Sequence, residues 1–236
     1  MVKYKMSQTT YKIDENKQEV LLSDQDQQVM MEWEKPYMEA CIDALKPDGD
    51  VLEIGFGCAY SANHIQSCNP KSHTIIECDG EVIKKLKEWA KDKPSVKIVE
   101  GRWQDVIHTL GMFDQIFMDD FPLDLNRDDN IIEYKFKNDF RLSIFIDLCM
   151  QMHMKVGSKI SAYLNGPPLI LSKRIKWCSS VINTPFKLDI PSSCKYRDTS
   201  QKECYIPLVT KTHRFNLYEY LRNDYMKNWT IEQLVC

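Results

Sequence analysis

The amino-acid sequence predicts an α/β protein with a single Rossmann-like core, in which helices cover a mostly parallel sheet. Short apolar segments alternate along the chain with segments of helical spacing, as they do in parallel sheets. The first apolar segment, residues 50–57, ends in the glycine-containing loop EIGFG, and an acidic residue closes the second segment. The chain has 236 residues, of which 43% are hydrophobic, and this is enough for one sizeable core.

The predicted elements follow in the order that such a sheet requires. Before the core, a polar N-terminal arm leads to an amphipathic helix at residues 28–46, which Pro36 must either kink or begin. Further helices are expected from Ala59, at 81–92 and at 137–154. The strands are expected at residues 50–57, 72–79, 95–105, 114–120 and 158–165, with a late antiparallel edge strand at 202–211.

This order divides the chain into three parts. We expect residues 1–46 to form an arm and a lid helix, 47–211 the core, and 212–236 a helical extension. In the extension, Leu217 and Leu221 lie four apart, as on one face of an amphipathic helix. Such a helix either packs on its own domain or forms the contact of a homodimer.

Composition and charge exclude several classes of protein. The formal net charge is −3, so direct binding to nucleic acid is not expected. No apolar run approaches the ~20 residues of a membrane helix. The N-terminus has no apolar signal core, and the nine cysteines include no C-x-x-C pair, which indicates reduced thiols in a cytoplasmic protein, with the nucleus also compatible. Cys149 and His153 have helical spacing but no second ligand pair, so no metal site is expected.

The loop after the first strand and the acid after the second predict a nucleoside site. Gly55 and Gly57 let the backbone approach a ligand, but Tyr60 stands where the dinucleotide fingerprint has its third glycine. Glu77 follows Gly55 by twenty-two residues and can accept hydrogen bonds from both hydroxyls of a ribose. A nucleoside without a diphosphate indicates S-adenosyl-L-methionine; the alternative is that Glu77 is a solvated strand-end acid.

The segment GRWQD, 101–105, leaves two interpretations open. Trp103 could form one wall of an adenine pocket, with Asp105 accepting from the adenine amino group. Alternatively, Trp103 is a tryptophan of the hydrophobic core.

Several of these motifs together resemble one family. The segments VMMEWEKPYM, VLEIGFGCAYSA, HTIIECD, EGRWQDV, MDDFPL and CYIPLVTK are similar, in sequence and in order, to those of the guanidino N-methyltransferases. This family includes guanidinoacetate N-methyltransferase and the fungal-type protein arginine methyltransferase that modifies the internal (δ) nitrogen. The resemblance covers about residues 20–211 and implies a class I S-adenosylmethionine-dependent methyltransferase fold with an N-terminal lid.

The resemblance also implies roles for individual residues. The acceptor's guanidino group would contact Glu34 and Asp119 as the catalytic carboxylates, and the backbone at Asn165 and Gly166 would meet the rest of the acceptor. Asp120 stands where the family often has threonine, and NGPP follows the fifth strand in place of Leu-Thr. The implied donor contacts are Met30, Met38, Phe56, Gly57, Cys58, Ala59, Tyr60, Ser61, Glu77, Cys78, Asp79, Arg102, Trp103 and Asp119.

Two carboxylates suit a guanidino acceptor. A guanidinium has a pKa above ~12 and is a poor nucleophile, because its lone pair is delocalised. A carboxylate can orient the cation through a bidentate pair and accept the proton that leaves. Asp119 is therefore expected to be the proton acceptor beside the donor, and Glu34 to reach the site from a lid. Asp120 remains unassigned.

Two other functions are compatible with this layout. Aminopropyltransferases of the spermidine synthase type share the predicted fold and an acid after the fourth strand, but the loop GFGCAY lacks their GGGDG-type run. A non-catalytic methyltransferase-like scaffold would not need both Glu34 and Asp119. The acceptor is a small molecule or a protein arginine, and the small molecule is slightly favoured because no separate docking domain is visible.

Overall fold

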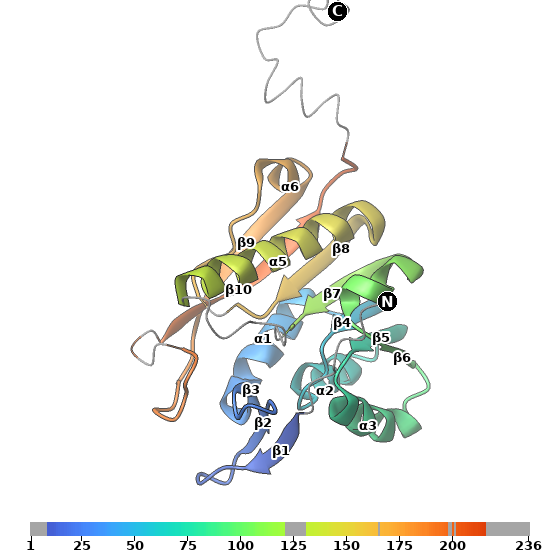
Figure 1. Cartoon of the computed structure of the whole chain (residues 1–236). Helices are drawn as coiled ribbons and strands as arrows, with labels where there is room; N and C mark the ends of the chain where they lie inside the picture. The colour runs from blue at the N-terminus through green and yellow to red at the C-terminus, as the bar shows by residue number, and fades with distance from the viewer. Residues whose placement is uncertain (1–8, 121–130, 165, 198–199, 201, 216–236) are drawn as a thin grey trace, which may run out of the picture.

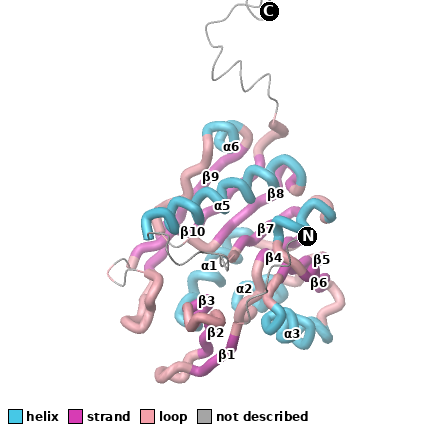
Figure 2. The backbone as a smooth tube through the Cα atoms, in the orientation of Figure 1, coloured by secondary structure: helices cyan, strands magenta, loops and turns pink. Residues whose placement is uncertain are grey.

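Helices cover both faces of a seven-stranded sheet, and the first three strands of the chain form a smaller, separate sheet (Figures 1 and 2). The computed structural model describes residues 9–120, 131–164, 166–197, 200 and 202–215, with the backbone alone at 131–140. Within these residues, no helix is both long and apolar enough to cross a membrane.

The large sheet has the strand order β6-β5-β4-β7-β8-β10-β9. Its parallel strands are β4 (Asp50–Ile54), β5 (Ser72–Glu77), β6 (Val96–Glu100), β7 (Phe113–Met118) and β8 (Met154–Ala162). Two antiparallel strands complete it, β9 (Ser179–Lys187) and β10 (Glu203–Lys211). The order reverses between β4 and β7, and ligands of such sheets bind beyond the carboxyl ends of the strands at this switch point.

The helices divide between the two faces. One core lies under α1 (Lys35–Leu45), α2 (Tyr60–Ser67) and α3 (Gly80–Trp89), and the other under α4 (Trp103–Val106), α5 (Ile131–Met152) and α6 (Lys173–Trp177). Figure 1 shows α5 running across the second face. Side chains of β4 alternate between the cores, Val51 in the first and Leu52 and Ile54 in the second, because successive strand residues point to opposite faces. Short 3₁₀ helices are formed by Glu32–Glu34 (η1), Ala90–Asp92 (η2) and Ile107–Thr109 (η3).

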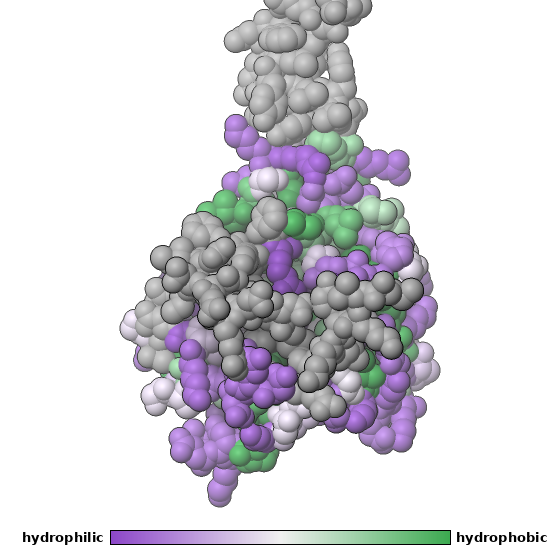
Figure 3. Space-filling view, viewed as in Figure 1, coloured by the Kyte–Doolittle hydropathy of each residue, from purple (hydrophilic) through white to green (hydrophobic). Residues whose placement is uncertain are grey.

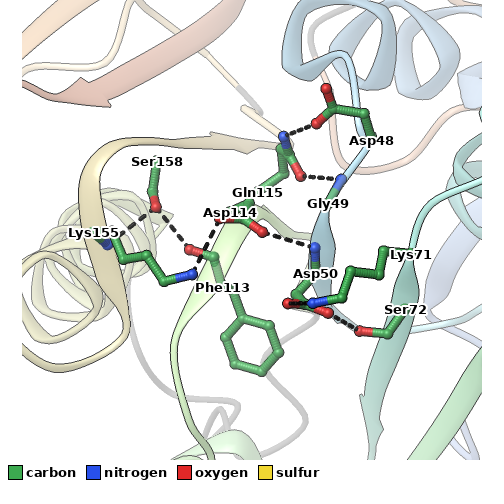
Figure 4. A network of polar contacts seen from close by, with 10 residues as sticks. All are labelled: Asp48, Gly49, Asp50, Lys71, Ser72, Phe113, Asp114, Gln115, Lys155 and Ser158. Atoms are coloured by element: carbon green, nitrogen blue, oxygen red, sulfur yellow. Dashed lines mark hydrogen bonds and ion pairs between the residues drawn. The ribbon is translucent and has the colours of Figure 1, made fainter.

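A polar network joins the amino ends of the central strands (Figure 4). The Asp114 carboxylate accepts from the Asp50 N–H at 2.9 Å and pairs with Lys155 at 3.5 Å. The Gln115 side chain accepts from the Gly49 N–H at 3.2 Å and donates to a neighbouring loop carboxylate. These bonds fix the register of β4 and β7 at one end of the sheet. The glycine loop and the candidate carboxylates lie at the other end.

The region before α1 differs from the predicted helix at 28–46. Its first residues form β3 (Gln28–Met31), which pairs with β2 (Glu19–Leu22), and β2 pairs with β1 (Thr10–Ile13). The α-helix begins only at Lys35, with Pro36 in its first turn, because proline lacks the N–H that an interior helical position needs. The polar arm is therefore largely a three-stranded sheet.

Two predicted strands also need correction. The strand predicted at 95–105 ends at Glu100, because Gly101 has φ +142° and Trp103 begins α4. The segment 202–211 forms β10 but is not the edge, since β9 pairs with its outer side. The edge strand β9 contains Pro185, and proline in sheets is favoured at edges.

The end of the described chain lies on α6. The Thr212 N–H donates to the Cys178 carbonyl at 2.9 Å, and the rings of His213 and Phe215 contact Trp177. In Figure 3, apolar residues gather over this end of the molecule, near α6 and one end of α5. The rest of the predicted extension, 216–236, lies outside the described residues.

Candidate active site

The glycine loop after β4 is in direct contact with the end of β7. Gly55 has φ +83°, and a Cβ atom there would lie 2.1 Å from the Asp119 carbonyl oxygen. The Asp119 N–H in turn donates to the Ile54 carbonyl at 3.0 Å. Only glycine fits both the backbone conformation and this space. The loop and the candidate catalytic acid are therefore positioned by one another.

Glu77 is held at the end of β5 by three backbone N–H groups. Its carboxylate accepts from Phe56 at 2.9 Å, from Cys78 at 2.6 Å and from Asp79 at 2.9 Å. Burial raises the pKa of this carboxyl, and the three N–H groups oppose that rise. A carboxylate has about four lone-pair positions, so one remains for a ligand hydroxyl. This arrangement fits the ribose of a nucleoside.

A small cavity lies between the loop and the N-terminal sheet. Residues from both sides line it, namely Thr9, Leu21, Val29, Met30, Gly55, Gly57, Glu77, Cys78, Asp79, Val82 and Asp119. Its volume is about 60 Å³, whereas ligand pockets usually measure ~300–1,000 Å³. The cavity as it stands is therefore smaller than a nucleoside requires.

Two contacts fasten the N-terminal sheet over this cavity. Thr9 donates to the Asp79 carboxylate through its backbone N–H at 3.1 Å and its hydroxyl at 2.8 Å. The Tyr11 hydroxyl donates to the Gly57 carbonyl at 2.6 Å. Asp79 also caps α3, so the same carboxylate joins the N-terminal sheet to α3.

Most of the other residues predicted to contact the methyl donor pack against the glycine loop or lie in the core next to it. Met30 Sδ accepts from the Cys58 N–H at 3.0 Å. Ala59 has φ 68° and caps α2, and the Ser61 hydroxyl donates to the buried Glu53 carboxylate. Phe56, Tyr60 and Met38 are buried in the core beneath α1–α3. Burial raises the pKa of the Cys58 thiol to about 12.

Trp103 lies in the core beneath α5 and holds Asp120. Its ring meets Phe145 edge-on at 5.0 Å, and its Nε1–H donates to the Asp120 carboxylate at 2.8 Å. Arg141 donates to the same carboxylate oxygen. Asp120 is thus engaged by two side chains.

Arg102 is paired with a neighbouring acid, whereas Cys78 faces the cavity. Arg102 pairs with Asp105 at 3.0 Å. The Asp105 carboxylate, which was predicted to accept from the adenine amino group, therefore already has a cationic partner. Cys78 lines the cavity, and burial raises the pKa of its thiol to about 12.

Glu34, on η1, is almost completely buried, with 4% of its surface exposed. Its carboxylate accepts from the Met31 N–H at 2.8 Å and lies near the hydroxyls of Tyr163 and Tyr196. Burial raises its pKa, and these neighbouring polar groups oppose the rise. The carboxylate is therefore fixed in position.

Glu34 and Asp119 form the centre of an acidic cluster. Burial raises the pKa of Asp119 well above its usual range, and the nearby charges of Glu34 and Asp120 raise it further. Like charges that disfavour one another are stabilised by bound cations. The structure thus brings the two predicted catalytic carboxylates together at the carboxyl end of the sheet.

Sequence motifs did not predict three residues around Glu34. Tyr163 follows β8, whereas Tyr196 and Arg197 belong to the loop between β9 and β10. Only the folded chain brings that loop to η1. Gly166 is in the loop after β8, and Asn165 lies outside the described residues.

Replacing Glu77 by alanine is expected to weaken donor binding. Hydrogen bonds to a charged group contribute ~1.5–3 kcal/mol each, so Glu77→Ala should raise the dissociation constant for S-adenosylmethionine at least tenfold. Isothermal titration calorimetry measures this, and circular dichroism checks that the variant is folded. Wild-type affinity in a folded variant would rule out Glu77 as the ribose acceptor.

Asp119→Asn is expected to stabilise the free protein at neutral pH. The fold raises the pKa of this carboxyl, while the unfolded chain ionises near pH ~3.9. Wild-type stability should then fall as pH rises above about 4, until the folded-state pKa is passed. Asparagine does not ionise, so the gain should be present at pH 7 and absent near pH 3.5. Thermal unfolding of both proteins across this pH range measures the difference in stability. A difference that does not change with pH would contradict the assignment.

Solved structures with similar architecture identify the fold. Spermidine synthase from Thermotoga maritima aligns with a TM-score of 0.57 and 15% identity, covering 96% of this chain and 77% of that one. The N-methyltransferase NodS from Bradyrhizobium japonicum aligns with a TM-score of 0.51 and 10% identity, covering 77% of this chain and 97% of that one. The fold is that of the class I S-adenosylmethionine-dependent methyltransferases.

The sequence identifies the family within this class. The family model for guanidinoacetate N-methyltransferase matches residues 2–145, more than half of the chain. This protein belongs to that family, as the motifs predicted.

Curated relatives carry the name protein arginine N-methyltransferase 2. The one from Candida glabrata is 43% identical over 105 residues, which cover 39% of this chain and 25% of the relative. The one from Yarrowia lipolytica is 35% identical over 130 residues, which cover 50% and 27%. The chain thus matches about a quarter of the length of these relatives.

Proposed function

We propose that this protein transfers the methyl group of S-adenosylmethionine to a nitrogen of a guanidino group. The observation that carries the proposal is the pair of neighbouring carboxylates, Glu34 and Asp119, of which Asp119 lies beside the glycine loop. The bound donor would supply an electrophilic methyl group on a positively charged sulfonium. The acceptor is a second cation. An acidic cluster offsets the repulsion between two cations that must come into contact.

The residues of the donor side fit a nucleoside. Glu77 faces the loop with a spare acceptor position, and Gly55 and Gly57 keep the loop free of side chains. Met30 and Thr9 would cover the donor from the lid. Movement of the N-terminal sheet would admit the donor and then exclude water from it.

Asp119 and Glu34 have different roles in this proposal. Glu34 accepts from the Met31 N–H and lies on η1, directly after the N-terminal sheet, so it orients the guanidinium plane. Asp119 is partly buried and lies at the strand end beside the loop. Its raised pKa favours accepting the proton that the guanidino nitrogen releases. Asp120 is occupied by Trp103 and Arg141 and therefore maintains the shape of the site.

The aminopropyltransferase alternative rests on fold alone. Spermidine synthase shares the architecture at 15% identity, a level at which activity does not follow from fold. Family membership supports the guanidino acceptor instead.

Methyl transfer from labelled S-adenosylmethionine tests the proposal directly. The assay offers guanidinoacetate, an arginine-containing peptide and putrescine as acceptors, and uses the Glu34→Gln/Asp119→Asn double variant as the negative control. We expect label in at least one guanidino acceptor and none in putrescine. Absence of label from both guanidino acceptors, with donor binding intact, would refute the proposed function.

A further inference from the structure

A positively charged side chain lies close to the acceptor carboxylate Glu34. The Arg197 guanidinium donates to the Tyr163 hydroxyl at 3.4 Å. The same hydroxyl interacts with Glu34. The Tyr163 hydroxyl therefore lies between the cation and the carboxylate, and the charge of Arg197 lowers the pKa of Glu34.

The loop segment 193–197, which carries this arginine, is fastened to the same support as Glu34. The side-chain amide of Gln28, on β3, donates to one backbone carbonyl of the segment at 2.9 Å and accepts from one backbone N–H at 2.8 Å. The ring of Tyr196 stacks on Trp33 of η1, with ring centres 6.0 Å apart and planes inclined by 26°. The spacing between the two opposite charges is thus set by packed elements.

The charge of Arg197 is not neutralised within the described part of the chain. Its contacts there are the Tyr163 hydroxyl and the Cys204 thiol, and it forms no ion pair with a described carboxylate. A guanidinium has five N–H donors, and two neutral partners cannot use them all. Arg197 is half-buried, and a cation that is shielded from water gains strongly from an anionic partner.

We propose that Arg197 determines acceptor specificity by binding a carboxylate that the acceptor carries a few bonds from its guanidino group. This inference rests on the proposed function, because it places the guanidinium at Glu34 and Asp119. A negative and a positive charge that flank one hydroxyl group complement a short zwitterion. An arginine side chain within a protein has no carboxylate at this spacing, because its own carboxyl group is in a peptide bond. The site therefore favours a small guanidino acid.

Equilibrium binding to the full chain tests this without requiring turnover. Calorimetry in the presence of S-adenosylhomocysteine compares guanidinoacetate with ethylguanidine, in which a methyl group replaces the carboxylate. The proteins are the wild type, Arg197→Gln, Arg197→Lys and the control Lys195→Gln, which removes an exposed charge two residues away. The methyl-transfer assay on the same proteins separates KM from kcat.

We expect the wild type to bind guanidinoacetate at least tenfold more tightly than ethylguanidine. Arg197→Gln should abolish that preference, raise KM for guanidinoacetate at least tenfold and leave kcat within about threefold, at ~1.4 kcal/mol per factor of ten. Arg197→Lys should retain part of the preference, and Lys195→Gln all of it. Binding of S-adenosylhomocysteine should not change.

Three results would overturn the inference. In the first, the wild type binds guanidinoacetate and ethylguanidine equally. This comparison needs no variant, so it is informative even if Arg197→Gln fails to fold. Arg197→Gln could leave guanidinoacetate binding unchanged. It could also weaken both acceptors equally, as expected if Arg197 only supports Glu34. If guanidinoacetate binding depends on Arg197 but no acceptor is methylated, the proposed function fails and the inference stands.

Discussion

Asp119→Asn is expected to lower the turnover number by two orders of magnitude or more. Asparagine keeps the shape of the side chain but cannot accept the proton that leaves the guanidino nitrogen. It also removes one of the charges that offset two adjacent cations. A hundredfold loss corresponds to ~2.7 kcal/mol, at ~1.36 kcal/mol per factor of ten. Steady-state kinetics with the active acceptor measures the effect.

Two other variants separate this role from those of the neighbouring acids. Glu34→Gln should mainly raise KM for the acceptor and leave donor binding intact, since the proposed function assigns Glu34 to the acceptor alone. Asp120→Asn should mainly lower the unfolding temperature, because Asp120 holds Trp103 and Arg141. Near-normal turnover in Asp119→Asn, with a large loss in Asp120→Asn, would transfer the role of proton acceptor to Asp120.

The core of the fold follows from local sequence. Apolar segments that end in glycine or an acid predicted β4, β5 and β7, because burial on both faces requires continuous apolar residues. The same strand ends predicted Gly55, Glu77 and Asp119, because chemistry in this architecture gathers at the carboxyl ends of the strands.

The N-terminal sheet was not predictable in the same way. The strands of residues 10–31 are only four residues long each, and their apolar residues fit helical and strand spacing equally well. Their pairing is decided by contacts distant in sequence, such as that of Thr9 with Asp79. Such contacts leave no periodic signal.

The surroundings of Glu34 were missed for a related reason. Tyr196 and Arg197 come from a loop more than 160 residues away in sequence, and a tyrosine or an arginine in a polar loop looks like any exposed residue. Their role depends on β9 and β10 returning antiparallel beside β8. The acidic half of the proposed acceptor site could be predicted from motifs, whereas its proposed positive half required the fold.

Gly55→Ala is expected to disrupt donor binding and turnover together. The new Cβ atom would lie 2.1 Å from the Asp119 carbonyl oxygen, at a backbone φ of +83° that disfavours alanine. Backbone atoms cannot yield as a flexible side chain does, so either the loop or the end of β7 must move. Movement of the loop displaces it from Glu77, and movement of β7 displaces the Asp119 carboxylate.

Gly111→Ala provides the matched control, because a Cβ atom there would meet no atom within 4 Å. We expect at least a tenfold loss of S-adenosylmethionine affinity and at least a hundredfold loss of turnover in Gly55→Ala, equivalent to ~1.4 and ~2.7 kcal/mol. The control should match the wild type in both. Calorimetry, steady-state kinetics and thermal unfolding on the three proteins measure these effects. If Gly55→Ala binds the donor normally and loses only turnover, the strand end has moved and the loop has not. If it retains both, the close contact between the loop and Asp119 does not position the site.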